Sequence, residues 1–269
     1  MPKWATPPAH MLGLFGSSSL ILLLLFASPA WGAISCAILS NSTGSSNTDA
    51  TTYATNSVTL VANRLYLLFV SHRTASGPAT AATASQTGAT WEAVTSQGFN
   101  NDDTTGVQRL TALRTLVASN ATDNVDIAFG GQTQTVASWG ILECSGVDTS
   151  GTNGSGAIVN TEVGITTGGP SLTLTFDAYS DSNNRPVVSF ATNATAVTGM
   201  DDLDWTQLFE AAPSDGAYIS IGWRDATDDT TVSQATSAGN ADFGGIGIEV
   251  KVSPQSNAPR ALDNSRHRR

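Results

Sequence analysis

Two groups of carboxylates could hold a cation. They are Asp201, Asp202 and Asp204 in one stretch, and Asp225, Asp228 and Asp229 in another. Loop carboxylates so close in sequence can point at one hard ion such as Ca²⁺, which prefers several oxygen ligands. The spacing does not match an EF-hand loop, and solvated turn residues are the alternative for both groups. The sequence therefore offers Ca²⁺ as its one candidate cofactor.

Apart from these carboxylates, the chain has few residues of the types that usually perform catalysis. Paired carboxylates could hydrolyse a glycosidic bond, but any acidic chain offers many such pairs. His72 is the one histidine between His10 and His267, which excludes a histidine-rich metal site and leaves His72 as the only base for a Ser–His–Asp triad. A lone histidine at the end of a strand is more often structural. With no nucleophile elbow and no phosphate-binding glycine loop, we expect no catalytic residues.

Two tryptophans are candidates for stacking on sugar rings. Trp91 and Trp205 begin expected strands beside polar loops, where an exposed indole could bind a glycan. Packing at the edge of the core is the alternative reading of both. Trp139 and Trp223 lie on apolar strands and are expected inside.

The chain has two cysteines, Cys36 and Cys144. In an oxidising compartment an even pair favours a disulfide, which would join the first strand after the leader to the strand at 135–144. Two buried free thiols are the alternative.

Composition and charge limit the partners. The hydrophobic content of 40% and the charged content of 13% suit a packed core rather than a disordered chain. Residues 31–252 hold seven basic and 21 acidic residues, a net charge of −14. Such a surface repels phosphate backbones, so we expect no nucleic-acid partner.

Residues 1–30 have the pattern of a secretory signal peptide. Lys3 precedes the apolar run at 20–27, and Ser28-Pro29-Ala30 offers small residues for cleavage. The run is shorter than a membrane span, so we expect export without a permanent membrane anchor. Residues 253–269 are polar and basic and are expected to form a flexible tail.

The expected fold is organised around the run Arg64–Ser71. It is hydrophobic on both faces, as in a central strand covered on both sides. About a dozen short strands with turns between them follow the leader, and no segment has a sustained helical period. The last strand, at 244–252, alternates with Ile246, Ile248 and Val250 on one face and is expected to pair beside an early strand. The loop at 148–156 is the best candidate midpoint. Together these patterns predict an all-β antiparallel β-sandwich forming a single domain at 31–252.

The order of these elements resembles a known group of domains. The strings LYLLFVSHRT, ATWEAV, LTALRTLV, WGILECSGVDT and GIGIEVKV follow one another across roughly residues 55–252. They resemble jelly-roll-like β-sandwich domains of bacterial secreted or surface proteins and of phage structural proteins. The resemblance implies adhesion, surface structure or glycan contact, and it carries no catalytic motif.

The sequence therefore predicts a secreted, non-enzymatic protein that acts as a surface, adhesive or matrix component. Glycan binding is a further possibility for such a protein. The alternative is a self-assembling subunit of a virion or an extracellular filament, whose partners would be other copies of itself. A polysaccharide-degrading enzyme is the third and weakest reading.

Overall fold

A computed structural model describes residues 33–100, 106–194, 197–200, 204–214, 216–237 and 239–254. All of them belong to one compact unit, Trp31–Arg269. The leader expected at residues 1–30 and the tail beyond Pro254 lie outside the described residues.

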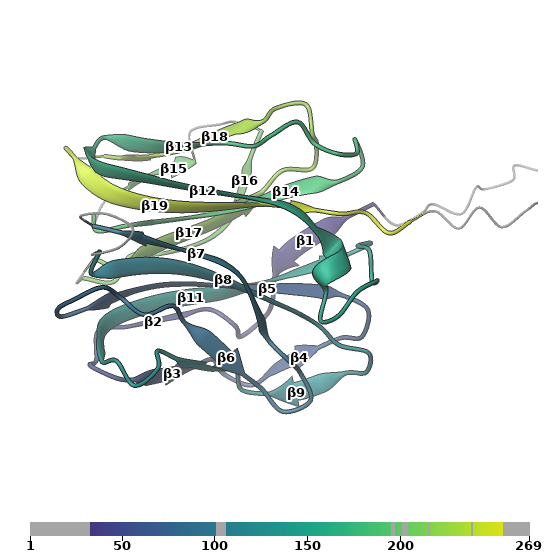
Figure 1. The fold of residues 1–269 in the computed structure, drawn as a ribbon, viewed down its shortest axis with the longest axis horizontal. Helices are drawn as coiled ribbons and strands as arrows, with labels where there is room; N and C mark the ends of the chain where they lie inside the picture. Colours follow the sequence, from purple (N-terminus) through teal and green to yellow (C-terminus); the bar gives the residue numbers. More distant parts are fainter. Residues whose placement is uncertain are drawn as a thin grey trace, which may run out of the picture. The chain divides into compact units, whose positions relative to one another are not determined.

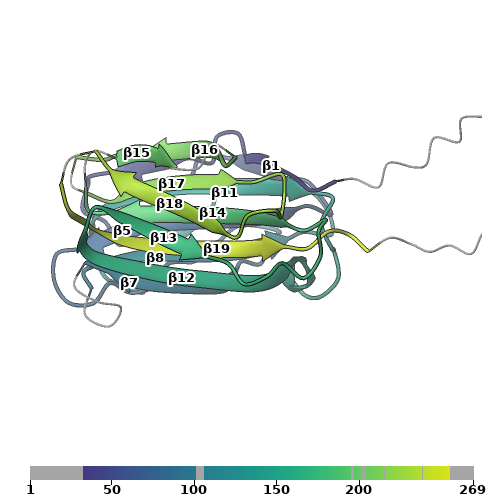
Figure 2. The same ribbon diagram turned by 90° about the horizontal axis from the view of Figure 1, so that it is seen from above.

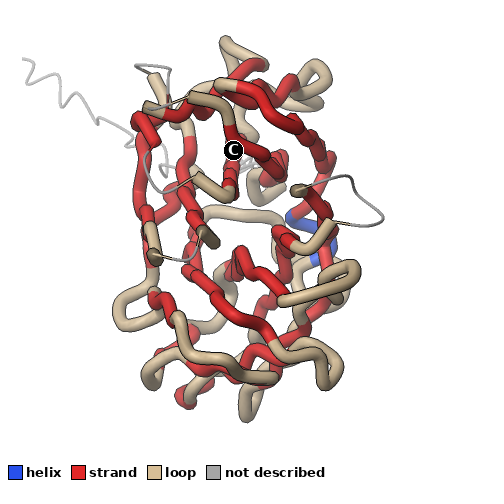
Figure 3. Tube along the Cα trace, turned by 90° about the vertical axis from the view of Figure 1, so that its left-hand side faces the viewer, coloured by secondary structure: helices blue, strands red, loops and turns tan. Residues whose placement is uncertain are grey.

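The described chain consists of antiparallel strands and one short 3₁₀ turn, η1 (Ser155–Ala157). Figure 3 shows strands on all sides and this single helical segment. The expectation of an all-β antiparallel sandwich is confirmed. Its strands are arranged as two jelly rolls in succession, joined near residues 146–157, where the midpoint loop is expected.

The N-terminal jelly roll has two main sheets. Its five-stranded sheet has the order β1-β11-β5-β8-β7, and its three-stranded sheet has the order β3-β10-β6. Strand β2 adds to β11, and β4 pairs with β9. The bounds are β1 (Ser35–Ile38), β2 (Gly44–Ser46), β3 (Thr52–Ala54), β4 (Val58–Leu60), β5 (Leu65–Thr74), β6 (Thr83–Ser85), β7 (Glu92–Phe99), β8 (Gln108–Leu116), β9 (Ala121–Asp123), β10 (Asp126–Ala128) and β11 (Gln134–Ser145).

The C-terminal jelly roll repeats this topology. Its sheets have the orders β12-β19-β14-β17-β16 and β13-β18-β15. If the eight main strands of each half are counted in chain order, both halves have sheets 1-8-3-6-5 and 2-7-4. The bounds are β12 (Ile158–Gly169), β13 (Ser171–Thr175), β14 (Arg185–Thr192), β15 (Val197–Met200), β16 (Thr206–Ala211), β17 (Tyr218–Trp223), β18 (Thr231–Thr236) and β19 (Ala241–Val250).

The equivalence of the halves extends to single positions. Trp91 and Trp205 directly precede the two fifth strands, β7 and β16, and each of these strands has a β-bulge after its second residue. Glu143 and Glu249 lie on the two eighth strands, opposite the second residues of β5 and β14. A shared strand order, a shared bulge and shared side chains together indicate an internal duplication.

Four layers of strands follow from this arrangement (Figure 1). The two five-stranded sheets lie in the middle and bury a common core between them, which includes Leu67, Phe69, Val187, Ile221 and Ile248. Each three-stranded sheet covers the outer face of its own five-stranded sheet and encloses a smaller core. Strand β5 is buried along almost its whole length because it has one core on each side, as the run Arg64–Ser71 predicts.

The middle sheets meet in a two-fold manner. Strand β12 lies beside β7, and β16 lies beside β1, so the first strand of each half is close to the fifth strand of the other. Figures 1 and 2 both show β7 and β12 running along the same edge. The sheets approach closely at Gly140 on β11, where a Cβ atom would lie 3.0 Å from Cδ1 of Ile221. The geometry is that of a self-complementary dimer interface within one chain.

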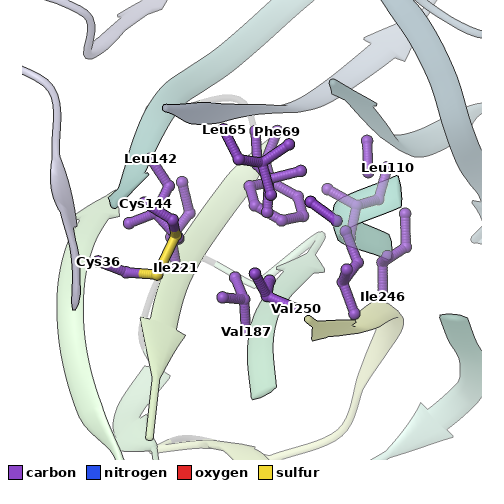
Figure 4. Packing of buried hydrophobic residues seen from close by; sticks show 14 of the residues in the cluster. Cys36, Leu65, Phe69, Leu110, Leu142, Cys144, Val187, Ile221, Ile246 and Val250 are labelled. Carbon is purple, nitrogen blue, oxygen red and sulfur yellow. A yellow bond between two sulfur atoms is a disulfide. The ribbon is translucent and has the colours of Figure 1, made fainter. Parts of the chain in front are cut away.

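Cys36 and Cys144 form a disulfide inside the central core. They lie directly opposite each other on β1 and β11, with their Cα atoms 4.2 Å apart. Figure 4 shows the sulfur atoms beside Leu142 and Ile221. The disulfide expected from the cysteine count is confirmed. In the C-terminal half the equivalent pair is Ile158 and Val250, so an apolar contact stands where the first half has a covalent bond.

One expectation about the last strand is wrong. Residues Ile246, Ile248 and Val250 do share the core face of β19, but β19 pairs with β12 and β14 of its own half rather than with an early strand. Strand β19 finds both of its neighbours within the second jelly roll. The sequence pattern did not indicate that the C-terminal half has a complete sheet of its own.

Candidate functional site

The clearest cavity lies at the end of the C-terminal jelly roll, near the start of β1 and the end of β19. It has a volume of about 600 Å³. The described residues that line it come from the loop at 180–185, from the segment 251–254 and from Ala33. Its lining is rich in amide and hydroxyl groups.

A buried carboxylate holds the floor of this pocket in place. Glu249 is 1% exposed, and its Oε1 accepts hydrogen bonds from Ser180 N (2.9 Å), Ser180 Oγ (2.9 Å) and Asn184 Nδ2 (2.6 Å). Its Oε2 accepts a bond from Asn160 Nδ2 at 3.0 Å. Four donors satisfy a charge that would otherwise be costly to bury. Ser180 and Asn184 line the pocket, so Glu249 fixes two of its polar groups.

The loop has its own internal order. Asn184 Oδ1 accepts a hydrogen bond from Val252 N at 3.0 Å, which joins the two segments that line the pocket. Asp181 Oδ1 accepts bonds from the backbone and side-chain nitrogens of Asn183, at 2.8 and 2.9 Å. These bonds favour the charged form and lower the pKa of Asp181. The polar groups of the loop are therefore preorganised.

Two cations flank the pocket, and both have partners. Arg185 Nε donates to Asp225 at 2.7 Å, and Lys251 Nζ lies 2.8 Å from a carboxylate oxygen of Asp148. Burial alone would raise the pKa of Asp148, but hydrogen bonds from Lys251 and Ser150 outweigh it and the pKa is lowered. Because each cation is neutralised nearby, the pocket suits a polar, uncharged ligand better than an anion.

The lining offers several hydrogen-bonding groups to a polar ligand. Fixed amides, hydroxyls and paired cations can form hydrogen bonds with neighbouring hydroxyl groups of a ligand. Glycoside hydrolysis needs two carboxyl groups facing the bond that breaks. Among the described lining residues the pocket presents a single carboxylate, that of Asp181.

The tryptophan candidates lie elsewhere. Trp91 is 8% exposed and Trp205 is 6% exposed. Trp91 packs in the outer core of the N-terminal half, and Trp205 packs in that of the C-terminal half, where it stacks on Phe176 with ring centroids 6.2 Å apart. Neither indole presents an open face to a sugar in this structure.

The carboxylates proposed for Ca²⁺ bind arginines. Arg224 is buried, and it forms ion pairs with Asp204 (3.2 Å), Asp228 (2.8 Å) and Asp229 (3.9 Å). These three residues thus gather around a guanidinium cation, while Asp225 pairs with Arg185. Asp201 and Asp202 lie outside the described residues. In the part of the chain that the structure describes, no three His, Cys, Asp or Glu residues lie together in a way that could hold a metal ion.

His72 is fully buried on β5. Its Nδ1 lies 2.8 Å from Gln134 Oε1, and its ring packs on Phe129 with centroids 4.5 Å apart. Burial lowers the pKa of His72 to about 4, and the charge of Arg109 acts in the same direction. The imidazole is therefore a neutral core group with no path to a substrate.

Comparisons with protein-family models, with curated proteins and with solved structures find no match to this chain. Among the described residues, no helix is long and apolar enough to cross a membrane.

Sequence reasoning did not identify the pocket. One signal was present: Glu249 is the only charged residue in the apolar stretch Phe243–Val250. A carboxylate on a strand that is buried on both faces must find donors, and the Ser- and Asn-rich loop at 180–184 supplies three of them in the fold.

Proposed function

We propose that this chain is an exported, non-enzymatic surface or matrix protein that binds glycans in the pocket at residues 180–185 and 251–254. Export is supported by the leader pattern and by the disulfide, because such bonds persist in oxidising compartments. The rigid double jelly roll acts as the scaffold, and the pocket acts as the contact site.

The observation that carries the glycan assignment is the hydrogen-bonded floor of the pocket. Ser180 is exposed and is held by Glu249 and Asn184, so its polar surface is oriented before a ligand arrives, whereas Asn184 is fully buried and supports Ser180 from below. Sugars present several hydroxyl groups at fixed spacing, and preorganised amides and hydroxyls match that pattern without paying to order side chains on binding. Recognition then rests on hydrogen bonds, since none of the described residues that line the pocket is aromatic.

The test is a glycan array probed with the exported full-length chain, with and without added Ca²⁺, followed by calorimetry on any glycan that binds. Ser253→Tyr places a bulky side chain at the exposed rim of the pocket and should abolish binding. Thr122→Tyr, at an exposed position on β9, is the matched control and should bind normally. An array that stays blank under both conditions rejects the glycan assignment.

Export has a separate readout. The chain recovered from the medium should begin at Trp31, as determined by N-terminal sequencing. An uncut leader in a cytosolic fraction would contradict export while leaving the pocket to be tested on its own.

A further inference from the structure

Strand β12 is an unusual edge. It is 12 residues long, forms the end of the second five-stranded sheet and, among the described residues, pairs only with β19. Its Val163 and Ile165 are 47% and 38% exposed, and they are the exposed large hydrophobic side chains of the described chain. An unpaired edge with exposed β-branched residues favours pairing with another strand.

The equivalent edge in the first half is protected. There β1 ends at Ile38, only two residues after the disulfide, and the chain turns at Asn41, whose φ of 64° is left-handed. Ser42 Oγ then bonds to the carbonyl oxygen of Leu39 at 2.7 Å, and β2 continues the edge as a separate short strand. Such a break prevents a long continuous edge. Strand β12 has no comparable break between Thr161 and Thr166.

Charge repulsion along β12 is weak. Residues 31–252 carry a net charge of −14, which opposes contact between copies over most of the surface. In β12 the single charged residue is Glu162, which is only partly exposed. The other edge strands of the large sheets, β1, β7 and β16, carry no more charge, but β12 is the longest of them and so offers the longest stretch where two copies of the chain can meet with little repulsion.

The sequence of the strand is nearly symmetric about Gly164. Val163 and Ile165 lie on either side of it, on the same exposed face. If two copies pair antiparallel about a two-fold axis through Gly164, Val163 of one copy lies opposite Ile165 of the other, twice. Glu162 then lies opposite Thr166, so no like charges face each other. Cross-strand pairs of β-branched residues stabilise a sheet.

We propose that β12 is a homodimer interface, in which two copies pair antiparallel through this strand in the register centred on Gly164. The pairing joins two five-stranded sheets into one continuous sheet and buries both exposed aliphatic pairs. Because an edge paired with itself is used up, the assembly closes at two copies and does not grow into a filament.

The test is sedimentation velocity of the exported full-length chain over a range of concentrations. The wild-type chain should pass from monomer to dimer and no further. Val163→Lys puts a charge against an aliphatic side chain and should raise the dimer dissociation constant by about tenfold or more. Thr52→Lys, at an exposed position on the edge strand β3, is the matched control and should leave the constant unchanged.

A second variant tests the register. Val163→Lys combined with Ile165→Glu places opposite charges across both pairs and should restore the dimer, whereas Val163→Lys with Ile165→Lys should not. Both positions are exposed, so the unfolding midpoints of all variants should stay close to that of the wild type. A wild-type chain that remains monomeric at every concentration, a dimer indifferent to Val163→Lys, or growth beyond two copies would overturn the proposal.

Discussion

The buried His72 makes the stability of the protein depend on pH in a defined window. The imidazole has a pKa of about 4 in the folded chain, against about 6.5 when unfolded. Below pH 6.5 the unfolded chain therefore binds a proton that the folded chain resists. The full stability is present above pH 6.5 and is lost progressively as the pH falls toward 4.

The magnitude follows from the two pKa values. Each unit of difference corresponds to about 1.4 kcal/mol, so protonation of the unfolded chain at His72 lowers the free energy of unfolding by about 3 kcal/mol across the window, and most of this loss is complete by pH 4.5. Carboxylates also titrate at the low end, and a variant is needed to separate them. His72→Gln removes the titrating group and keeps a polar side chain beside Gln134.

Urea denaturation of both proteins at pH 7.5 and pH 4.5 measures the effect. At pH 7.5 the variant should be the less stable of the two, because it loses the ring packing on Phe129. At pH 4.5 the difference in the free energy of unfolding should shift in favour of the variant by about 2–3 kcal/mol. His267→Gln, in the expected tail, is the control and should keep the wild-type pH dependence. If the difference between wild type and His72→Gln is the same at both pH values, the assignment of His72 as a buried neutral group is refuted.

Four further variants test other parts of the structure. Replacing Cys36 and Cys144 together by valine should lower the free energy of unfolding by about 2–4 kcal/mol in urea titrations. An unchanged urea midpoint would mean that the disulfide does not constrain the unfolded chain. Glu249→Gln turns an amide nitrogen toward one of the groups that donate to Glu249. It should lower the free energy of unfolding by about 2–4 kcal/mol and weaken glycan binding. Trp91→Ala and Trp205→Ala should each lower the free energy of unfolding by about 3–5 kcal/mol, because each opens a cavity. The folded fraction of both variants should still bind the glycan. If either variant folds but no longer binds, its tryptophan stacks on the sugar after all.

The sequence predicts the middle of the fold better than its outer layers. The central strand β5 and the last strand β19 could be recognised because their apolar side chains are continuous or alternate over eight or more residues. Strands β2, β3, β6 and β9 are three residues long, which is too short for any periodic signal. They form because a neighbouring strand offers a partner, and that partner is defined only after the chain has folded.

The duplication was hidden for a related reason. The halves share the order in which their strands pair, a bulge and a few side chains. The residues that face the central core differ, because the position held by Phe69 on β5 is held by Ser189 on β14. Packing constrains the total volume between two sheets rather than the identity at each position. Two halves can therefore diverge in sequence and still bury a common core.

The functional proposals fall where the two halves differ. In the first half Arg64 precedes the third strand and pairs with Glu143, so a long cationic side chain covers the carboxylate. In the second half Asn184 has the equivalent place before β14 and binds Glu249 through a short amide. A short neutral side chain thus takes the place of the long cation, and both Asn184 and Ser180, which bind Glu249, line the pocket. The same comparison distinguishes β12 from the interrupted first strand of the N-terminal half.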